Sequence, residues 1–323
     1  MDTIESALRA AIGIQAVYFC LAAIGLNVQF GYAGLLNFGQ AGFLAVGAYA
    51  FAVSVASFDL PFFVAIFVGL AATALLALIL GIPTLRLRAD YLAIATIAAA
   101  EVIRLFFGAS FKDYFNGRDG VSQFSTAFQE ANPFSGPVLG FRPDDFWVMV
   151  VGWTLVLLSS LLLLLLMRSP WGRVLKAIRE DEEAVRSLGK NVYSYKMQAL
   201  VLGGLIGCLG GFILAFGQNS VQPDNFSSDL TFIVYTMLIL GGAARIFGPI
   251  FGAVVFWGSL SLISGILGDL TAGDNPILPT WLITDQQIGS VRFMIVGIAL
   301  ILLMIFRPQG VFGDRKEIAL DAR

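Results

Sequence analysis

Apolar runs of about 17–22 residues recur along the whole 323-residue chain. A helix rises about 1.5 Å per residue, so each run is long enough to cross a hydrocarbon core of about 30 Å. Hydrophobic residues make up 58% of the chain and charged residues 13%, which is about half the charge of an ordinary soluble domain. These features predict an all-α fold, a polytopic transmembrane helical bundle without a sizeable soluble domain.

A hydropathy window of about 19 residues predicts about nine spans, within a range of about eight to ten. All of them belong to a single transmembrane domain that covers 1–323. The predicted spans are 10–26, 38–57, 61–82, 91–107, 146–167, 197–217, 230–247, 250–267 and 291–306.

The longest strongly charged stretch, 168–196, lies between two of these spans. Pro170 stands near its start, where a missing N–H costs no helical hydrogen bond, and Gly189 stands where a left-handed cap is common. These signals, with apolar residues at helical spacing, predict one amphipathic helix over 171–189. Its apolar positions are Trp171, Leu175, Ile178, Val185 and Leu188. Its expected i,i+4 ion pairs are Lys176–Glu180, Arg179–Glu183 and Glu182–Arg186.

Two interpretations of this amphipathic helix stay open. It either lies in the lipid interface or docks a soluble partner. Four successive acidic residues at 180–183 would be repelled by anionic lipid, which favours docking.

The distribution of basic residues predicts how the bundle is oriented. Short loops rich in Lys and Arg stay in the cytoplasm. With 168–196 placed inside and the spans alternating, fourteen Lys and Arg residues fall inside and five outside. The N-terminus is then expected outside and the C-terminus in the cytoplasm.

Residues 25–50 are rich in glycine and carry four amide side chains, Asn27, Gln29, Asn37 and Gln40. Glycines allow helices to pack closely in a membrane. Glycines together with amides also suit a broken or re-entrant helix that lines a cavity. Both interpretations remain open, and under the second one the four amides are candidates for a translocation pathway.

Glu101 and Arg104 are the ionisable residues expected well inside the bilayer, and they lie on one helix face. A lone charge there would cost about 2.5–3.5 kcal/mol, so we expect the two to neutralise each other. The pair either holds helices together or faces the solute path. A zwitterionic amino acid needs a counter-charge for each end, so both residues are also candidates for the translocation pathway.

Several classes of chemistry are excluded by residues that the chain lacks. It has no histidine, which excludes His-based metal sites and Ser-His catalysis. It has no G-x-x-x-x-G-K-[ST] motif, so the chain itself is not expected to bind ATP. Cys20 and Cys208 lie in apolar spans and are expected to be small buried hydrophobes. We expect no catalytic residue, metal, cofactor or nucleic acid partner, and no cleaved signal peptide at the acidic start of the chain.

Glu183-Ala184-Val185 followed by Gly189 resembles the E-A-A-x-x-x-G loop of ABC importer permeases, with Val185 in place of the second alanine. Further stretches resemble the branched-chain amino acid ABC permeases, in the order of that family and over nearly the whole chain. They are GYAG at 31–34, GQAGFLAVGAY at 39–49, TLRLRADYLAIA at 84–95, PDNF at 223–226, LILGGAARIFGPIFG at 238–252 and MIFRPQGVFG at 304–313. Taken together they resemble the LivM-type subunit of the family.

The resemblance implies a permease subunit that imports leucine, isoleucine and valine across the bacterial inner membrane. The implied partners are a LivH-like second permease subunit, two cytoplasmic ABC ATPase subunits that bind the ATP, and a periplasmic or surface-anchored substrate-binding protein. Within the loop 168–196, the residues expected to couple to the ATPases are Trp171, Arg179, Glu182, Glu183, Ala184 and Gly189.

Two alternative functions stay open at this point. Permeases for urea or short amides resemble this family closely. A secondary transporter driven by an ion gradient belongs to another class, and it would be expected to carry several intramembrane carboxylates. Glu101 is the only residue here that qualifies.

Overall fold

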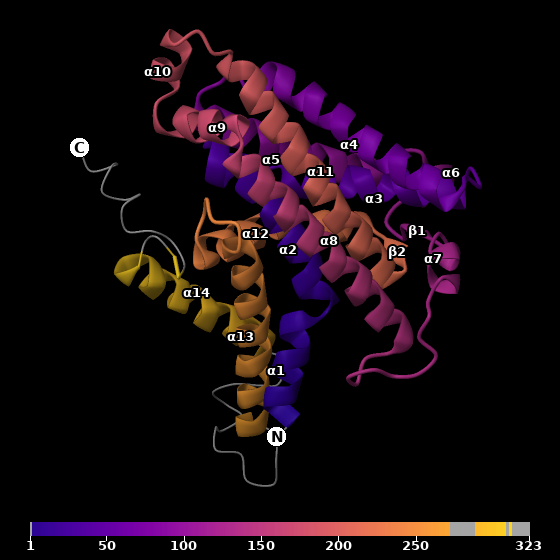
Figure 1. Ribbon diagram of the computed structural model, residues 1–323. Coiled ribbons are helices and arrows are strands. Elements are labelled where there is room, and N and C mark those ends of the chain that lie inside the picture. Colours follow the sequence, from indigo (N-terminus) through magenta and orange to yellow (C-terminus); the bar gives the residue numbers. More distant parts are fainter. Residues whose placement is uncertain (1, 272–287, 308–309, 312–323) are drawn as a thin grey trace.

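The computed structural model describes residues 2–271, 288–307 and 310–311. Within these residues, seven helices are long and apolar enough to cross a membrane, and two further apolar helices are shorter. Together they confirm the predicted polytopic helical bundle of about nine spans (Figure 1).

The first span runs from Thr3 to Tyr32. It consists of α1 (Asp2–Ile12), α2 (Ile14–Leu26) and the π-helical segment η1 (Asn27–Tyr32). The other spanning or apolar helices are α3 (Gln40–Ala56), α4 (Phe62–Thr84), α5 (Ala89–Ala109), α8 (Pro143–Arg168), α11 (Val192–Gln218), α12 (Ser228–Gly241), α13 (Gly248–Thr271) and α14 (Ile288–Phe306).

Short elements fill the loops at the two ends of the bundle. They are α6 (Lys112–Phe115), β1 (Val121–Ser122), α7 (Thr126–Glu130), α9 (Pro170–Glu180), α10 (Glu182–Ser187), β2 (Ser220–Val221) and the 3-10 helix η2 (Pro223–Phe226). The strands pair antiparallel, with Val121 opposite Val221. This pairing joins two loops that were both predicted on the outer side.

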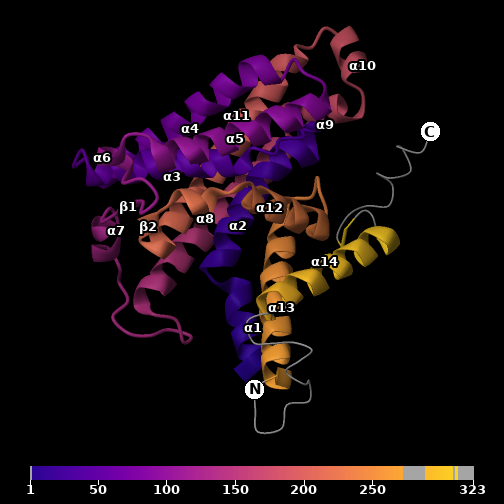
Figure 2. The same ribbon diagram turned by 180° about the vertical axis from the view of Figure 1, so that it is seen from behind.

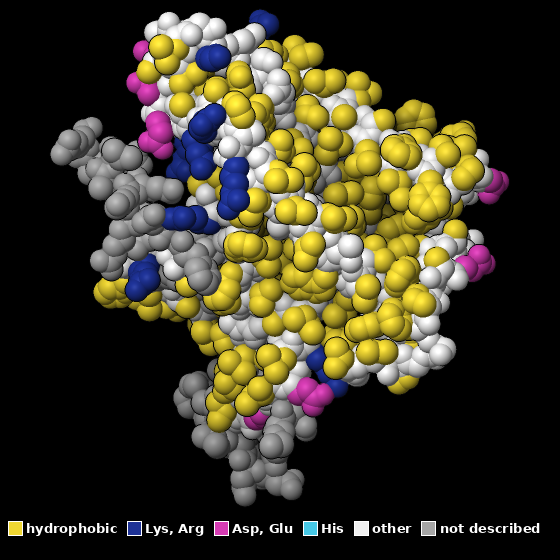
Figure 3. All heavy atoms as spheres, in the orientation of Figure 1, with side chains coloured by type: hydrophobic (Ala, Val, Ile, Leu, Met, Phe, Trp, Pro, Cys, Tyr) yellow, Lys and Arg dark blue, Asp and Glu magenta, His cyan; other side chains and the backbone are white. Residues whose placement is uncertain are grey.

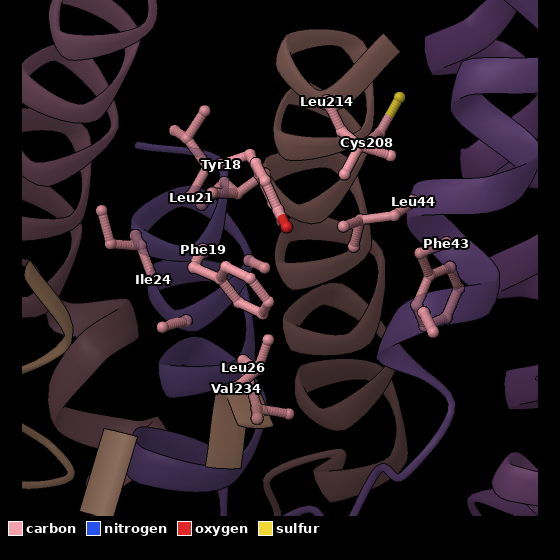
Figure 4. Close-up of a cluster of buried hydrophobic side chains, with 14 of the residues drawn as sticks. Tyr18, Phe19, Leu21, Ile24, Leu26, Phe43, Leu44, Cys208, Leu214 and Val234 are labelled. Atoms are coloured by element: carbon pink, nitrogen blue, oxygen red, sulfur yellow. The ribbon is translucent and has the colours of Figure 1, made fainter. Parts of the chain in front are cut away.

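Helix α11 is the centre of the bundle and packs between α2 and α3. Figure 4 shows Tyr18 and Leu21 from α2 and Leu44 from α3 on opposite sides of α11. A β-carbon at Gly203 of α11 would lie 2.5 Å from the Gly25 carbonyl oxygen of α2. Glycines here therefore allow backbones to touch, as the close-packing interpretation of residues 25–50 predicted. Cys20 and Cys208 are buried and unpaired, as expected.

Helix α3 is short because it begins inside the bundle. It follows an irregular segment at 34–39, in which the Phe38 N–H donates to Thr96 Oγ1 at 3.0 Å. Thr96 lies about 10 Å along α5 from its first residue. The first span therefore leads into an interrupted helix that starts partway into the bundle, which confirms the predicted broken segment.

Helix α12 also begins inside the bundle, but the chain reaches its first residue from the opposite end of the bundle. The Ser228 hydroxyl donates to Glu101 Oε2 at 3.4 Å, and Glu101 lies about 18 Å along α5. The first turns of α3 and α12 meet where the Ala41 N–H donates to Thr231 Oγ1 at 3.0 Å. The span predicted over 230–247 is too long, since α12 ends at Gly241 and the next residue, Gly242, has a φ of 104°.

Lys and Arg side chains gather at the α9–α10 end of the bundle, and hydrophobic side chains cover most of the same face elsewhere (Figure 3). The Lys and Arg side chains that line hollows at this end are Arg86, Arg88, Arg168, Lys176, Arg179, Arg186, Lys196 and Arg245. All eight were predicted on one side of the membrane. Arg315, Lys316 and Arg323, also predicted there, lie outside the described residues.

The two ends of the described chain lie at different ends of the bundle. Thr3 Oγ1 donates to Asp269 Oδ2 at 2.7 Å, where α1 and the last turn of α13 run side by side, far from α10 (Figure 2). Val311 N donates to Leu240 O at 3.0 Å, next to the turn that contains Arg245. Val311 is therefore at the basic end.

Gly203→Val is expected to lower the thermal stability of the purified protein, because the added side chain would collide with the α2 backbone. Overpacking of this kind costs about 1–3 kcal/mol. The control is Gly268→Val in α13, where a β-carbon meets nothing within 4 Å. Both changes carry the same helix-propensity effect, so equal melting temperatures for the two variants would contradict the close approach of α2 and α11.

Candidate coupling and translocation site

The charged loop between α8 and α11 contains two short helices in place of the single helix predicted over 171–189. Helix α9 ends at Glu180, and α10 begins after Asp181, whose backbone is extended (φ −152°, ψ 101°). The Asp181 carboxylate accepts a hydrogen bond from Ala184 N at 2.9 Å and caps α10. The single-helix prediction is wrong because aspartate stabilises a helix start more than a helix interior.

The ends of the loop and most of its buried side agree with prediction. Pro170 is the first residue of α9, and Gly189 has a left-handed φ of 76°. The predicted apolar residues Leu175, Ile178 and Val185 are buried. Leu188 is instead 80% exposed, because the break at Asp181 takes α10 out of the helical register of α9.

Polar contacts fix this loop against α11. Glu182 forms ion pairs with Arg186 at 2.8 Å and with Lys196 at 2.5 Å, so the predicted Glu182–Arg186 pair is confirmed. Trp171 Nε1 donates to Gln198 Oε1 at 2.7 Å. The loop is therefore bonded to α11 from both of its helices.

One edge of α10 and the residues that follow it are exposed. Glu183, Ala184 and Gly189 are exposed, as is Leu188. Gly189 has open space where a β-carbon would stand. The structure thus brings the acidic and the glycine positions of the predicted coupling motif to one accessible edge.

Arg179 joins α9 to the break in the first span. Its Nη1 donates to the Gly31 carbonyl oxygen at 2.6 Å, and its Cγ lies beside Gly34. One turn earlier, Lys176 Nζ lies 5.7 Å from the centre of the Tyr32 ring, which is cation–π geometry. Both cations therefore contact 31–34, and the predicted pairs Lys176–Glu180 and Arg179–Glu183 do not form among the described residues.

Asn27 joins the same end of the first span to the turn between α12 and α13. Its Oδ1 accepts from Ala244 N and its Nδ2 donates to Arg245 O, both at 2.8 Å. Asn27 is fully buried, and its amide supplies partners for two backbone groups of this partly buried turn. Direct contacts therefore run from α9 through η1 to 242–247.

The other three predicted amides brace the segment 34–39. Asn37 Nδ2 donates to Gln29 Oε1 at 2.7 Å, and Gln29 Nε2 donates to Leu200 O at 3.1 Å. Gln40 Nε2 donates to Gly203 O at 3.4 Å. All three are fully buried. The structure bonds Asn37 to Gln29 and bonds Asn27, Gln29 and Gln40 to backbone groups of other segments, while the part of the four amides in translocation stays a prediction.

Glu101 and Arg104 form the expected pair, and a third charge joins them. Arg104 Nε donates to Glu101 Oε1 at 2.9 Å, and Arg104 Nη1 donates to Asp224 Oδ1 of η2 at 2.9 Å. The Glu101 side chain is 38% exposed and that of Asp224 67%. Exposed charges at this depth are costly against lipid, so this side of α5 faces protein or water.

Asp224 and Thr231 were not among the residues predicted for the site. The signal available in the sequence was Pro223 at the start of a short motif directly before a helix. Nothing local shows that this motif descends into the bundle, from beside Gly108 to the level of Glu101.

A helical membrane bundle with two interrupted helices that start near its middle is typical of membrane permeases, because many transporters line their solute path with broken helices. Residues 8–306 match the family described as branched-chain amino acid transport system, permease component. The chain belongs to this family and is of its LivM type. It is thus a permease component of an ABC transporter.

Three relatives show the range of the similarity. The high-affinity branched-chain amino acid transport system permease protein LivM of Escherichia coli (strain K12) is 29% identical over 317 residues, covering 93% of this chain and 69% of LivM. The probable LivM of Methanocaldococcus jannaschii is 23% identical, covering 93% of this chain and 92% of its own length. The guanosine ABC transporter permease protein NupQ of Bacillus subtilis is 26% identical, covering 83% and 86%.

Proposed function

We propose that this chain is one of two permease subunits of an ATP-driven importer of branched-chain amino acids in the bacterial inner membrane. The observation that carries the proposal is the set of contacts that links the exposed α10 edge, through α9, Arg179 and Asn27, to both interrupted spans. The names of the LivM relatives support the substrate class.

The α9–α10 end is proposed to face the cytoplasm, because short loops rich in Lys and Arg stay there. Val311 lies at this end, which supports a C-terminus in the cytoplasm. One of the two ATPase subunits would bind the edge that contains Glu183 and Gly189. A substrate-binding protein would dock at the opposite end, over the β1–β2 pair.

A LivH-like second permease subunit is proposed to face the exposed charges of α5 and η2, so that the solute passes between the two subunits. Glu101 and Asp224 suit the ammonium group of an amino acid, and Arg104 suits its carboxylate. The path would then offer a counter-charge to each end of the zwitterion at a depth where a lone charge is costly against lipid.

In this mechanism the permease transmits motion and does no covalent chemistry. ATP-driven closure of the partners displaces α10 and α9. Arg179 carries the displacement to the Gly31 carbonyl, and Asn27 carries it to 242–247. Because each interrupted helix is held by specific bonds, the bundle changes between two packed arrangements as a rigid-body transition.

Uptake by proteoliposomes that contain the complete transporter tests the function. With ATP supplied on the ATPase side, labelled leucine is expected to accumulate, and labelled urea and guanosine are not. Accumulation of urea alone would contradict the substrate class. Uptake that needs a proton gradient and continues without ATP would contradict the whole proposal.

Arg179→Ala is expected to lower the amount of leucine taken up per ATP hydrolysed by about tenfold, since coupling between sites is typically worth about 1–3 kcal/mol. The matched control is Arg173→Ala, an exposed arginine on the same helix. Both quantities are measured on the assembled transporter. A ratio that is the same in the two variants would remove Arg179 from the coupling path.

Glu101→Gln is expected to slow leucine uptake at least fivefold while assembly with the ATPases stays normal, because the solute loses one counter-charge. Glu130→Gln, an exposed acid of α7, serves as the control and should transport normally. If the Glu101 variant is fully active, the charged cluster does not belong to the solute path.

A further inference from the structure

An apolar groove lies between α8 and the start of α13. It has a volume of about 530 Å³ and is lined by residues of α8 from Trp153 to Leu164 and by Phe247 and Ile250. Several of these side chains are open to the surroundings, with Leu157 65% exposed and Phe247 67% exposed. An open groove with such a lining in a membrane protein takes up an apolar chain.

A basic pocket of about 410 Å³ continues this groove toward the α9 end, and the two share Leu164 and Phe247. Three cations line the pocket, one from each of three elements: Arg168 ends α8, Lys176 lies on α9 and Arg245 lies in the turn before α13. Among the described residues that line it, none is acidic. The pocket therefore suits an anion.

The size and depth of the two hollows match one leaflet of a bilayer. From Trp153 to Leu164 the groove is about 16 Å long along α8, at about 1.5 Å per residue. Half of a hydrocarbon core is about 15 Å thick. The cations stand at the end of the groove where the basic loop begins, which is the level of lipid headgroups. Figure 3 shows this change from basic to hydrophobic side chains on one face.

We propose that the basic pocket and the groove together bind one anionic phospholipid from the leaflet on the α9 side. Its phosphate lies among Arg168, Lys176 and Arg245, and an acyl chain lies along α8. Basic pockets between spanning helices on the cytoplasmic side are suited to anionic headgroups. Lys176 also lies over the Tyr32 ring, so the bound lipid contacts the path that joins α9 to the first helix break.

Native mass spectrometry of the full-length protein in detergent tests this site. The protein is titrated with phosphatidylglycerol and with phosphatidylcholine that carry the same two oleoyl chains. Phosphatidylglycerol is expected to bind at least tenfold more tightly. Arg168→Gln, Lys176→Gln and Arg245→Gln are each expected to weaken its binding about fivefold, since one basic residue contributes about that factor near a charged headgroup.

Two sets of matched controls separate specific binding in the pocket and groove from the effects of overall positive charge and overall hydrophobicity. Arg173→Gln and Lys190→Gln remove basic residues of the same loop that do not line the pocket, and they should leave the preference for phosphatidylglycerol intact. Leu157→Trp fills the groove and should weaken binding of both lipids. Leu158→Trp, at a 52% exposed position that does not line the groove, should not.

Four results would overturn the proposal. The first is equal binding of the two lipids, and the second is equal losses in pocket and control variants. The third is normal binding by the Leu157→Trp variant, which would mean that the pocket holds phosphate without a lipid chain. The fourth is cross-linking of Leu157→Cys to a second permease subunit in native membranes, which would mean that protein fills the groove.

Discussion

Backbone N–H and C=O groups that are released where a helix breaks inside a membrane must find partners within the protein. Hydrocarbon offers none, and each unsatisfied group costs several kcal/mol. In this permease the partners are side chains of other segments. Thr231 accepts from the first turn of α3 inside the bundle. Nearer the basic end, Arg179 donates to Gly31, and Asn27 bonds both a donor and an acceptor of 244–245.

The same bonds explain how a loop at one end reaches the middle of the bundle. A helix break that was solvated by water could move independently of its neighbours. Here the break after η1 is bonded to α9, and η1 is bonded through Asn27 to the turn before α13. Under the proposed coupling, these bonds are what would make the interrupted helices respond together when α9 moves.

Much of the fold could be predicted from local pattern. Long apolar runs define the spans, and the one-sided apolar residues of 171–185 define the buried side of the loop, because hydrophobic burial depends on residue type and spacing. The split at Asp181 was missed, since a capped helix start and a continued helix differ by only about 1 kcal/mol. The partner of Asn27 could not be found either, because it lies 218 residues away in the chain. Asp224 escaped prediction for the same reason, as the depth of a loop is set by packing against α5.

Hydrogen exchange at 242–247 tests the central claim most directly. In the full-length protein in detergent, the Ala244 amide is predicted to exchange slowly although it lies outside any helix, because Asn27 holds it. In Asn27→Leu this exchange should accelerate strongly while the amides of α11 keep their protection. Fast exchange in the unmodified protein, or the same rate in both proteins, would contradict the claim that Asn27 holds the turn between α12 and α13.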